Sequence, residues 1–148
     1  MNPPLRLLGA FQQATDKQPS MLLQLEERQM WVAAEITGGF PYTVIVPDLQ
    51  ARTTFDRRSA KLHKTTRNRP LPPWALYMAG VVAILDRDGL TLDGATIVIA
   101  GDEPPGPRYH HALGMAFTAL WHQANDRTYN TDTLMSLMDE VRRTYVRS

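Results

Sequence analysis

Short apolar runs separated by polar breaks fill the first third of the chain, a pattern typical of strands. The predicted strands occupy residues 21–26, 30–36, 42–46 and 50–55. Pro47 and Asp48 interrupt the pattern between the third and fourth runs. Residues 1–20 are only weakly patterned, with at most one helical turn near residues 7–13. We therefore expect a loose N-terminal arm, 1–20, followed by one domain over 21–148.

Beyond residue 70 the apolar positions recur at three- and four-residue spacing, which indicates helices with one buried face. The predicted helices run from Pro72 to Gly89, from the turn after residue 100 to Gln123, and onward from Thr131, which is expected to cap the last one. The apolar run 95–100 predicts a strand between the first two. Strands first, then helix, strand, helix and helix indicate an α+β protein with a mixed β-sheet covered by helices.

The segment between the strand 95–100 and the next helix is where an activity is expected. It reads Gly101-Asp102-Glu103-Pro104-Pro105-Gly106-Pro107-Arg108-Tyr109-His110-His111. A strand–turn–helix of this kind aims the first N–H groups of the helix at one point, which suits an anion such as a phosphate. We expect Asp102 and Glu103 to point outward, away from such a ligand. The arginine in this turn, Arg108, has the charge to pair with phosphate oxygens.

Two parts of the sequence resemble the galactokinase branch of the GHMP small-molecule kinases. Residues 72–123 carry the resemblance most clearly, through Trp74-Ala75-Leu76-Tyr77-Met78-Ala79-Gly80-Val81-Val82, then Asp93-Gly94, then the strand and turn ending Gly101-Asp102-Glu103-Pro104-Pro105-Gly106. Residues 21–55 are more weakly similar, through Glu35-Ile36-Thr37-Gly38-Gly39-Phe40. The resemblance implies the N-terminal domain of that family, which is similar to the second domain of ribosomal protein S5.

The resemblance also implies a chemistry, ATP-dependent phosphoryl transfer to a sugar hydroxyl, with ATP and Mg²⁺ as cofactors. Gly106, Arg108 and the backbone of Tyr109 and His110 would then contact the nucleotide phosphates. On the sugar side, the matching positions are Glu35 and Gly39.

The family pattern is incomplete in this chain. Where the family has Gly-Leu-Ser-Ser-Ser, this sequence has Pro107-Arg108-Tyr109-His110-His111, which places bulky side chains where a phosphate cradle needs small ones. On the sugar side, Ile36 replaces the family's His, and Arg28 matches an upstream Arg only with a spacing that differs by one. No residue can be assigned as the catalytic base by matching, and the family's catalytic Asp and C-terminal domain would lie beyond Ser148.

Two functions from different classes therefore stay open. The first is a degenerate or incomplete sugar kinase domain, absent or very weak in catalysis on its own. The second is a non-catalytic binding or interaction module, such as a pseudokinase-like relative or one subunit of a larger assembly. An apolar face left uncovered by a missing C-terminal domain would favour a homodimer or a partner carrying that domain.

Composition and charge narrow the remaining possibilities. The chain has no cysteine, no apolar run of membrane-spanning length and no secretory signal, so we expect a cytoplasmic protein with no membrane partner. Adjacent residues on a helix point about 100° apart, so His110 and His111 do not predict a metal site. Residues 52–69 hold seven Lys and Arg against one Asp. With no interleaved aromatic residues and no nucleic-acid motif, this block predicts a solvated, mobile loop rather than a nucleic-acid site.

Overall fold

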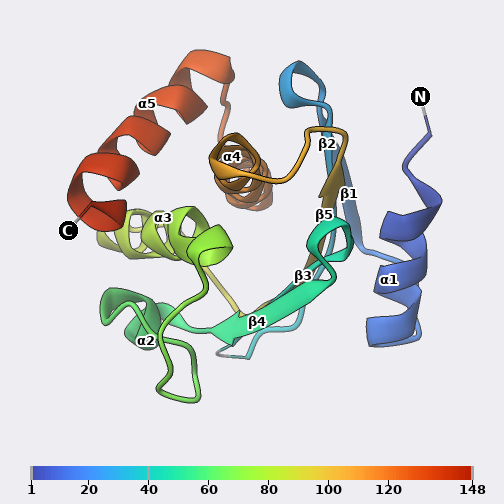
Figure 1. The fold of residues 1–148 in the computed structure, drawn as a ribbon, viewed down its shortest axis with the longest axis horizontal. Coiled ribbons are helices and arrows are strands. Elements are labelled where there is room, and N and C mark those ends of the chain that lie inside the picture. The colour runs from blue at the N-terminus through green and yellow to red at the C-terminus, as the bar shows by residue number, and fades with distance from the viewer. Residues whose placement is uncertain (1, 40, 148) are drawn as a thin grey trace.

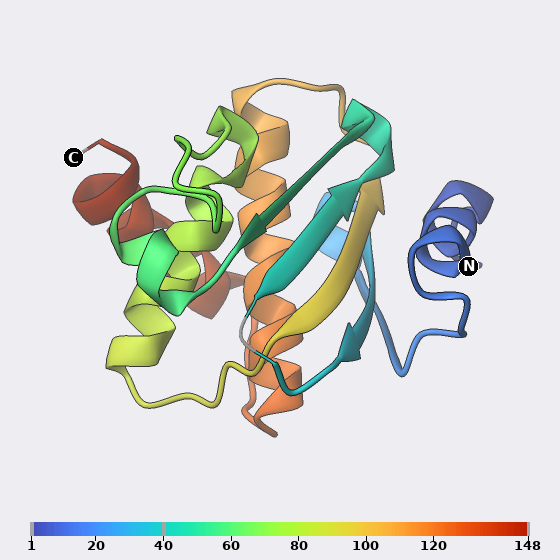
Figure 2. The ribbon, with the colours of Figure 1, turned by 90° about the horizontal axis from the view of Figure 1, so that it is seen from below.

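A five-stranded sheet lies between one helix and a group of helices in the computed structural model, which describes residues 2–39 and 41–147 (Figure 1). The strands are β1 (Met21–Leu25), β2 (Met30–Ile36), β3 (Tyr42–Val46), β4 (Ala51–Phe55) and β5 (Ala95–Gly101). The helices are α1 (Leu5–Thr15), α2 (Arg57–Lys61), α3 (Leu76–Arg87), α4 (Pro107–Ala124) and α5 (Thr131–Val141). Helix α1 covers one face of the sheet, and α3 and α4 lie on the other (Figures 1 and 2).

The strand order is β1-β2-β5-β3-β4, so β5, the last strand in the sequence, lies at the centre. It runs parallel to β3, and every other neighbouring pair is antiparallel. The register between β2 and β5 pairs Met30 with Gly101 at one end and Ile36 with Ala95 at the other. Because of this register, Gly101 lies at the same end of the sheet as Met30, and Glu35 lies near the opposite end.

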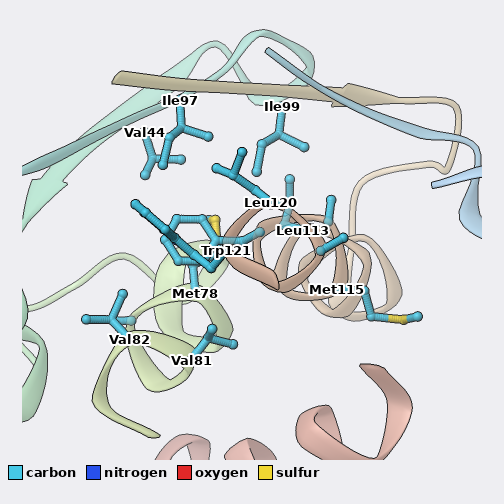
Figure 3. Close-up of a cluster of buried hydrophobic side chains, with 14 of the residues drawn as sticks. Val44, Met78, Val81, Val82, Ile97, Ile99, Leu113, Met115, Leu120 and Trp121 are labelled. Atoms are coloured by element: carbon cyan, nitrogen blue, oxygen red, sulfur yellow. The ribbon is translucent and has the colours of Figure 1, made fainter. Parts of the chain in front are cut away.

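The core lies between the sheet and helices α3 and α4. Alternate residues of the strands, such as Val44, Ile97 and Ile99, point toward Trp121 of α4 (Figure 3). All four side chains are buried. At about 25 cal/mol per Å² of apolar surface removed from water, a fully buried Ile or Val stabilises the fold by roughly 1.5–3 kcal/mol. The period-two and period-3.6 patterns of the sequence therefore meet in one core, which confirms the predicted α+β class with a mixed sheet.

Helix α1 corrects the expected loose N-terminal arm. Residues 5–15 form three turns of helix, and Leu7 and Phe11 are fully buried against Ala33, Val98 and Ala100 of the sheet. Those sheet residues leave an apolar face that water would otherwise contact, and a helix presenting Leu7 and Phe11 on one side covers it. In the sequence this face is marked by Leu7, Phe11 and the small Ala10, too few apolar residues to outweigh the polar residues around them.

Two further local predictions were wrong. Asn130, not Thr131, caps α5, because the Asn130 side chain accepts the N–H of Thr133 at 2.8 Å. The basic block contains a short helix, α2, which Asp56 caps by accepting the N–H of Ser59 at 2.7 Å.

Within the described part of the chain, no helix combines the length and apolar character needed to cross a membrane.

Candidate functional site

The turn between β5 and α4 presents the open end of a helix. Gly106 precedes the first residue of α4 with φ 148°, a conformation that favours glycine. The N–H of His110 donates to the carbonyl of Gly106 at 3.0 Å, which closes the first helical turn. The N–H groups of Arg108 and Tyr109 have no partner inside the helix, and Pro107 has no N–H to offer. Of these two N–H groups, only that of Arg108 belongs to an exposed residue, since Tyr109 is fully buried.

One side of this turn is held by Asp48, from the 3₁₀ turn between β3 and β4. Its carboxylate accepts the N–H of Gly101 at 2.8 Å, the Arg6 Nε at 2.6 Å and the Tyr109 hydroxyl. Arg6 also donates from Nη2 to the carbonyl of Gly101 at 2.7 Å. Burial, together with the bond to Asp48, raises the pKa of Tyr109, so this hydroxyl stays protonated. The Tyr109 ring is fully buried and therefore does not obstruct the open helix end.

The other side of the turn is held by Arg28, from the 3₁₀ turn between β1 and β2. Arg28 donates from Nε to Glu103 Oε1 at 2.8 Å and from Nη2 to both Glu103 Oε2, at 3.2 Å, and the carbonyl of Arg108, at 2.9 Å. The bond from Arg28 lowers the pKa of Glu103. The expectation that Glu103 points outward was wrong, because this ion pair draws the carboxylate inward. Asp102 does point outward, with 65% of its side chain exposed.

The two adjacent histidines lie in different surroundings. Arg28 Nη1 lies 2.9 Å from His111 Nδ1, and the His111 ring meets Tyr77 edge-on, with 5.4 Å between ring centroids. An arginine has only donors, so His111 Nδ1 accepts and the imidazole is neutral. Burial lowers the pKa of His111 and of His110, and the charge of Arg28 adds to the effect on His111. Among the described residues, no three His, Asp or Glu side chains converge on one point, so the two histidines do not belong to such a metal-binding group.

Residues 103–108 line a hollow of about 410 Å³ beside the open helix end. Arg28 neutralises the Glu103 carboxylate, whereas the Arg108 side chain is 84% exposed and 3.6 Å from Glu103. The two guanidinium groups and the one carboxylate leave a local charge of +1 beside the N–H of the exposed residue Arg108, which suits an anion. The same residues do not fit Mg²⁺, since they lack a hydroxyl and their one inward carboxylate is already paired.

The two residues expected on the sugar side lie at the other end of the sheet. Glu35 pairs in register with Thr96, five positions before Gly101, which at about 3.3 Å per residue is roughly 16 Å along the strand. Its carboxylate lies 3.4 Å from Lys17 Nζ. The carbonyl of Gly39 accepts the N–H of Gly94 at 2.8 Å. Of the residues expected on the phosphate side, Gly106 and Arg108 line the hollow, whereas Tyr109 is buried and the N–H of His110 is bound to the carbonyl of Gly106; Glu35 and Gly39 lie apart from all of them.

Sequence reasoning missed the three residues that position this turn, Arg6, Asp48 and Arg28. Arg28 had one signal, its near match to an arginine of the resembled family. Asp48 follows a proline in a predicted break between strands, where an acid is ordinary. Arg6 lies in the segment expected to be loose. No local pattern links these positions, because the contacts join residues 42 to 95 positions apart.

Several solved structures similar to this one are small-molecule kinases. Galactokinase from Lactococcus lactis, complexed with galactose, superposes with a TM-score of 0.68 and 14% identity over 96% of this chain. Mevalonate kinase from Methanococcus jannaschii gives 0.57 and 12% over 77%. Phosphomevalonate kinase from Streptococcus pneumoniae, in complex with phosphomevalonate and AMPPNP, gives 0.50 and 14% over 80%. The sequence matches no family model and no curated protein.

The matched region is a part of each kinase. The chain spans 42% of the length of the galactokinase and 36% of that of the mevalonate kinase. The fold is that of the N-terminal domain of GHMP kinases, which confirms the resemblance drawn from the sequence at the level of fold. The identities of 12–14% carry no residue roles from those enzymes to this chain.

Proposed function

We propose that this chain is a degenerate GHMP-type kinase domain that binds the phosphates of a nucleotide at the start of α4. The observation that carries the proposal is the juxtaposition of the Arg108 N–H, which has no partner inside the helix, with the exposed Arg108 guanidinium, beside a hollow of about 410 Å³. The kinase fold supports it, since AMPPNP is bound in one of the similar structures.

The site differs in kind from a glycine- and serine-lined cradle. Here the anion would be held by the backbone N–H of Arg108 and its flexible guanidinium, with Asp48 and Arg28 fixing the turn from either side. Such a site binds charge but has no group of its own to activate a sugar hydroxyl or to hold Mg²⁺. We therefore expect the chain to bind a nucleotide but to catalyse phosphoryl transfer very weakly or not at all. The reaction implied by the family resemblance is phosphoryl transfer from ATP to a sugar hydroxyl.

The sugar side rests on the weaker part of the resemblance, Glu35 and Gly39. If these positions still bind a sugar, galactose should stabilise the protein and Glu35→Gln should remove the effect. The separation of roughly 16 Å from the phosphate site predicts that galactose and nucleotide act independently of one another.

The proposal is tested by thermal unfolding with and without ATP, in EDTA and in Mg²⁺. At ten times its Kd, a ligand that binds only the folded state adds about 1.4 kcal/mol, which raises the Tm by roughly 3–6 °C for a domain of this size. Arg108→Gln should reduce the shift, and Arg127→Gln, an exposed arginine after α4, should not. No shift at millimolar ATP would refute the proposal, and ATP-dependent phosphorylation of galactose by the isolated chain would refute the expected loss of catalysis.

A further inference from the structure

A second hollow lies along the edge of the sheet, between β4 and residues 63–70, with a volume of about 750 Å³. Its lining is polar and basic: Arg52, Thr53, Thr54, Thr65, Thr66, Arg67, Arg69 and Pro70. We call these residues the β4 groove. In Figure 1 the segment 62–70 lies at the lower edge of the molecule, whereas the turn that leads into α4 lies toward the top. The groove is therefore separate from the proposed nucleotide site.

The segment 63–70 is built onto the sheet rather than loose. The N–H of Thr66 donates to the carbonyl of Thr54 on β4 at 3.0 Å, and the N–H of Thr65 donates to the carbonyl of Arg69 at 2.8 Å. Lys64 and Pro70 form an isolated antiparallel bridge. Because β4 is an edge strand, the segment takes up part of its unpaired edge. These bonds correct the expectation of a mobile loop.

No carboxylate of residues 2–39 or 41–147 forms an ion pair with the positive charges of the β4 groove. Among the described residues, Asp86 pairs with Arg57 and Lys61 on α2, at 3.6 and 3.1 Å. None of the ion pairs of the described residues includes Arg52, Arg67 or Arg69, and all three are exposed. Unpaired arginines on one concave surface concentrate positive potential there and attract anions.

A smaller hollow of about 260 Å³ extends this surface, since it shares Thr65 and Thr66 with the β4 groove. It adds Arg58 and Lys64, which again have no carboxylate partner among the described residues. Its one acid, Asp56, is occupied in capping α2. The two hollows together form a strip of five free cations, which fits a ligand with several successive negative charges better than a compact one.

We infer that the β4 groove and its extension bind single-stranded nucleic acid through the phosphodiester backbone. A flexible strand follows a concave strip, whereas a flat bilayer would touch only its rim. The lining contains arginine and threonine, which contact phosphate oxygens, and no aromatic side chain on which a base would stack. Binding should therefore be sensitive to salt and indifferent to base sequence.

The test is fluorescence anisotropy of labelled 20-nucleotide dT and rU strands, titrated with the protein between 50 and 300 mM salt. With three to five phosphates neutralised, the slope of log K against log salt should be about −2 to −3.5. Arg67→Gln with Arg69→Gln should reduce the steepness of this slope by about 1.4 for both strands. The control for net charge is Lys17→Gln with Arg127→Gln, which removes two exposed cations outside the groove, one of them paired with Glu35.

Each outcome decides the inference. An unchanged melting temperature of the Arg67 and Arg69 variant, with weaker binding than the control, supports it. Equal losses in both double variants would show that net charge alone acts, and no binding at 50 mM salt would also refute the inference. Binding to vesicles with 30% phosphatidylserine but to neither strand would assign the surface to a membrane. ATP thermal shifts that are unchanged in the Arg67 and Arg69 variant would separate this surface from the nucleotide site.

Discussion

The guanidinium of Arg28 and the carboxylate of Glu103 form a two-point ion pair, with Nε to Oε1 at 2.8 Å and Nη2 to Oε2 at 3.2 Å. Their side chains are only 12% and 16% exposed. The pair joins the turn after β1 to the turn before α4, 75 positions apart in the sequence. It thus fixes the turn at which we propose that a nucleotide binds.

Removing the guanidinium should cost much more than an exposed ion pair would. In Arg28→Met the Glu103 carboxylate loses both hydrogen bonds from Arg28 and keeps only the exposed Arg108, at 3.6 Å, while the carbonyl of Arg108 loses its donor. Hydrogen bonds to charged groups contribute about 1.5–3 kcal/mol each, so we expect the free energy of unfolding to fall by roughly 2–4 kcal/mol. Urea denaturation at pH 7.5 measures it.

Arg87→Met is the matched control for that experiment. Arg87 also contacts two carboxylates, those of Asp88 at 3.2 Å and Glu140 at 3.0 Å, but its side chain is 62% exposed. Exposed pairs contribute about 0–1 kcal/mol. Equal losses in the two variants would contradict the view that Arg28 holds the turn by a largely buried pair.

The neutral ring of His111 should make stability depend on pH. Burial and the charge of Arg28 lower its folded pKa, whereas the unfolded chain protonates near pH 6.5. Between these two values the unfolded state binds more protons, so the free energy of unfolding falls as the pH falls below about 6.5.

Chemical denaturation at pH 7.5 and 5.5 would measure this effect. His111→Gln keeps an acceptor for Arg28 Nη1 but does not titrate, so its loss between the two pH values should be smaller than that of the wild type. Some loss should remain, because burial lowers the pKa of His110 as well. An identical loss in both proteins would show that His111 does not contribute to the pH dependence.

The Tyr109 hydroxyl ties α4 to Asp48, and its removal should loosen that end of the helix. Tyr109→Phe leaves the Asp48 carboxylate with Arg6 and the N–H of Gly101 and removes one charge-assisted bond, so we expect a loss of about 1.5–3 kcal/mol. Tyr129→Phe, at a partly buried tyrosine outside this network, should cost less than about 0.5 kcal/mol. The Tm and the urea midpoint of the two variants provide the comparison. Equal losses of stability would show that the Tyr109 hydroxyl does not hold the turn.

The parts of the fold that the sequence predicts are those with a dense local signal. The strand 95–101 and the helix after Gly106 follow from an unbroken apolar run, a turn and then three- and four-residue spacing. The inward turn of Glu103 depends on Arg28, far away in the sequence, and no local rule indicates it. The same holds for Asp48, whose three partners come from α1, β5 and α4.

A close approach of helices is another feature that only the structure shows. A Cβ added at Gly80 of α3 would lie 2.6 Å from Val141 Cγ1 and 2.9 Å from Tyr145 Cγ, whereas one added at Gly9 of α1 would meet nothing within 4 Å. Alanine favours a helix over glycine by about 1 kcal/mol. We therefore expect Gly9→Ala to stabilise by about 0.5–1 kcal/mol and Gly80→Ala to destabilise by about 1–3 kcal/mol. Changes of the same sign in thermal unfolding would contradict this packing of α3 against the C-terminal segment.

Helix α1, which the sequence did not predict, packs on the face of the sheet opposite α3 and α4, and substitutions in it can test this packing. Phe11 is fully buried against that face, and replacing a buried Phe by Ala costs about 3–5 kcal/mol through lost burial and the cavity left behind. Leu5 lies in the same helix with 86% of its surface exposed, so Leu5→Ala should change stability by less than about 0.5 kcal/mol. Both substitutions keep a good helix former, so the difference between them in urea denaturation isolates packing from helix propensity. If Phe11→Ala costs no more than Leu5→Ala, residues 5–15 do not pack on the sheet, and the loose arm expected from the sequence would be the better description.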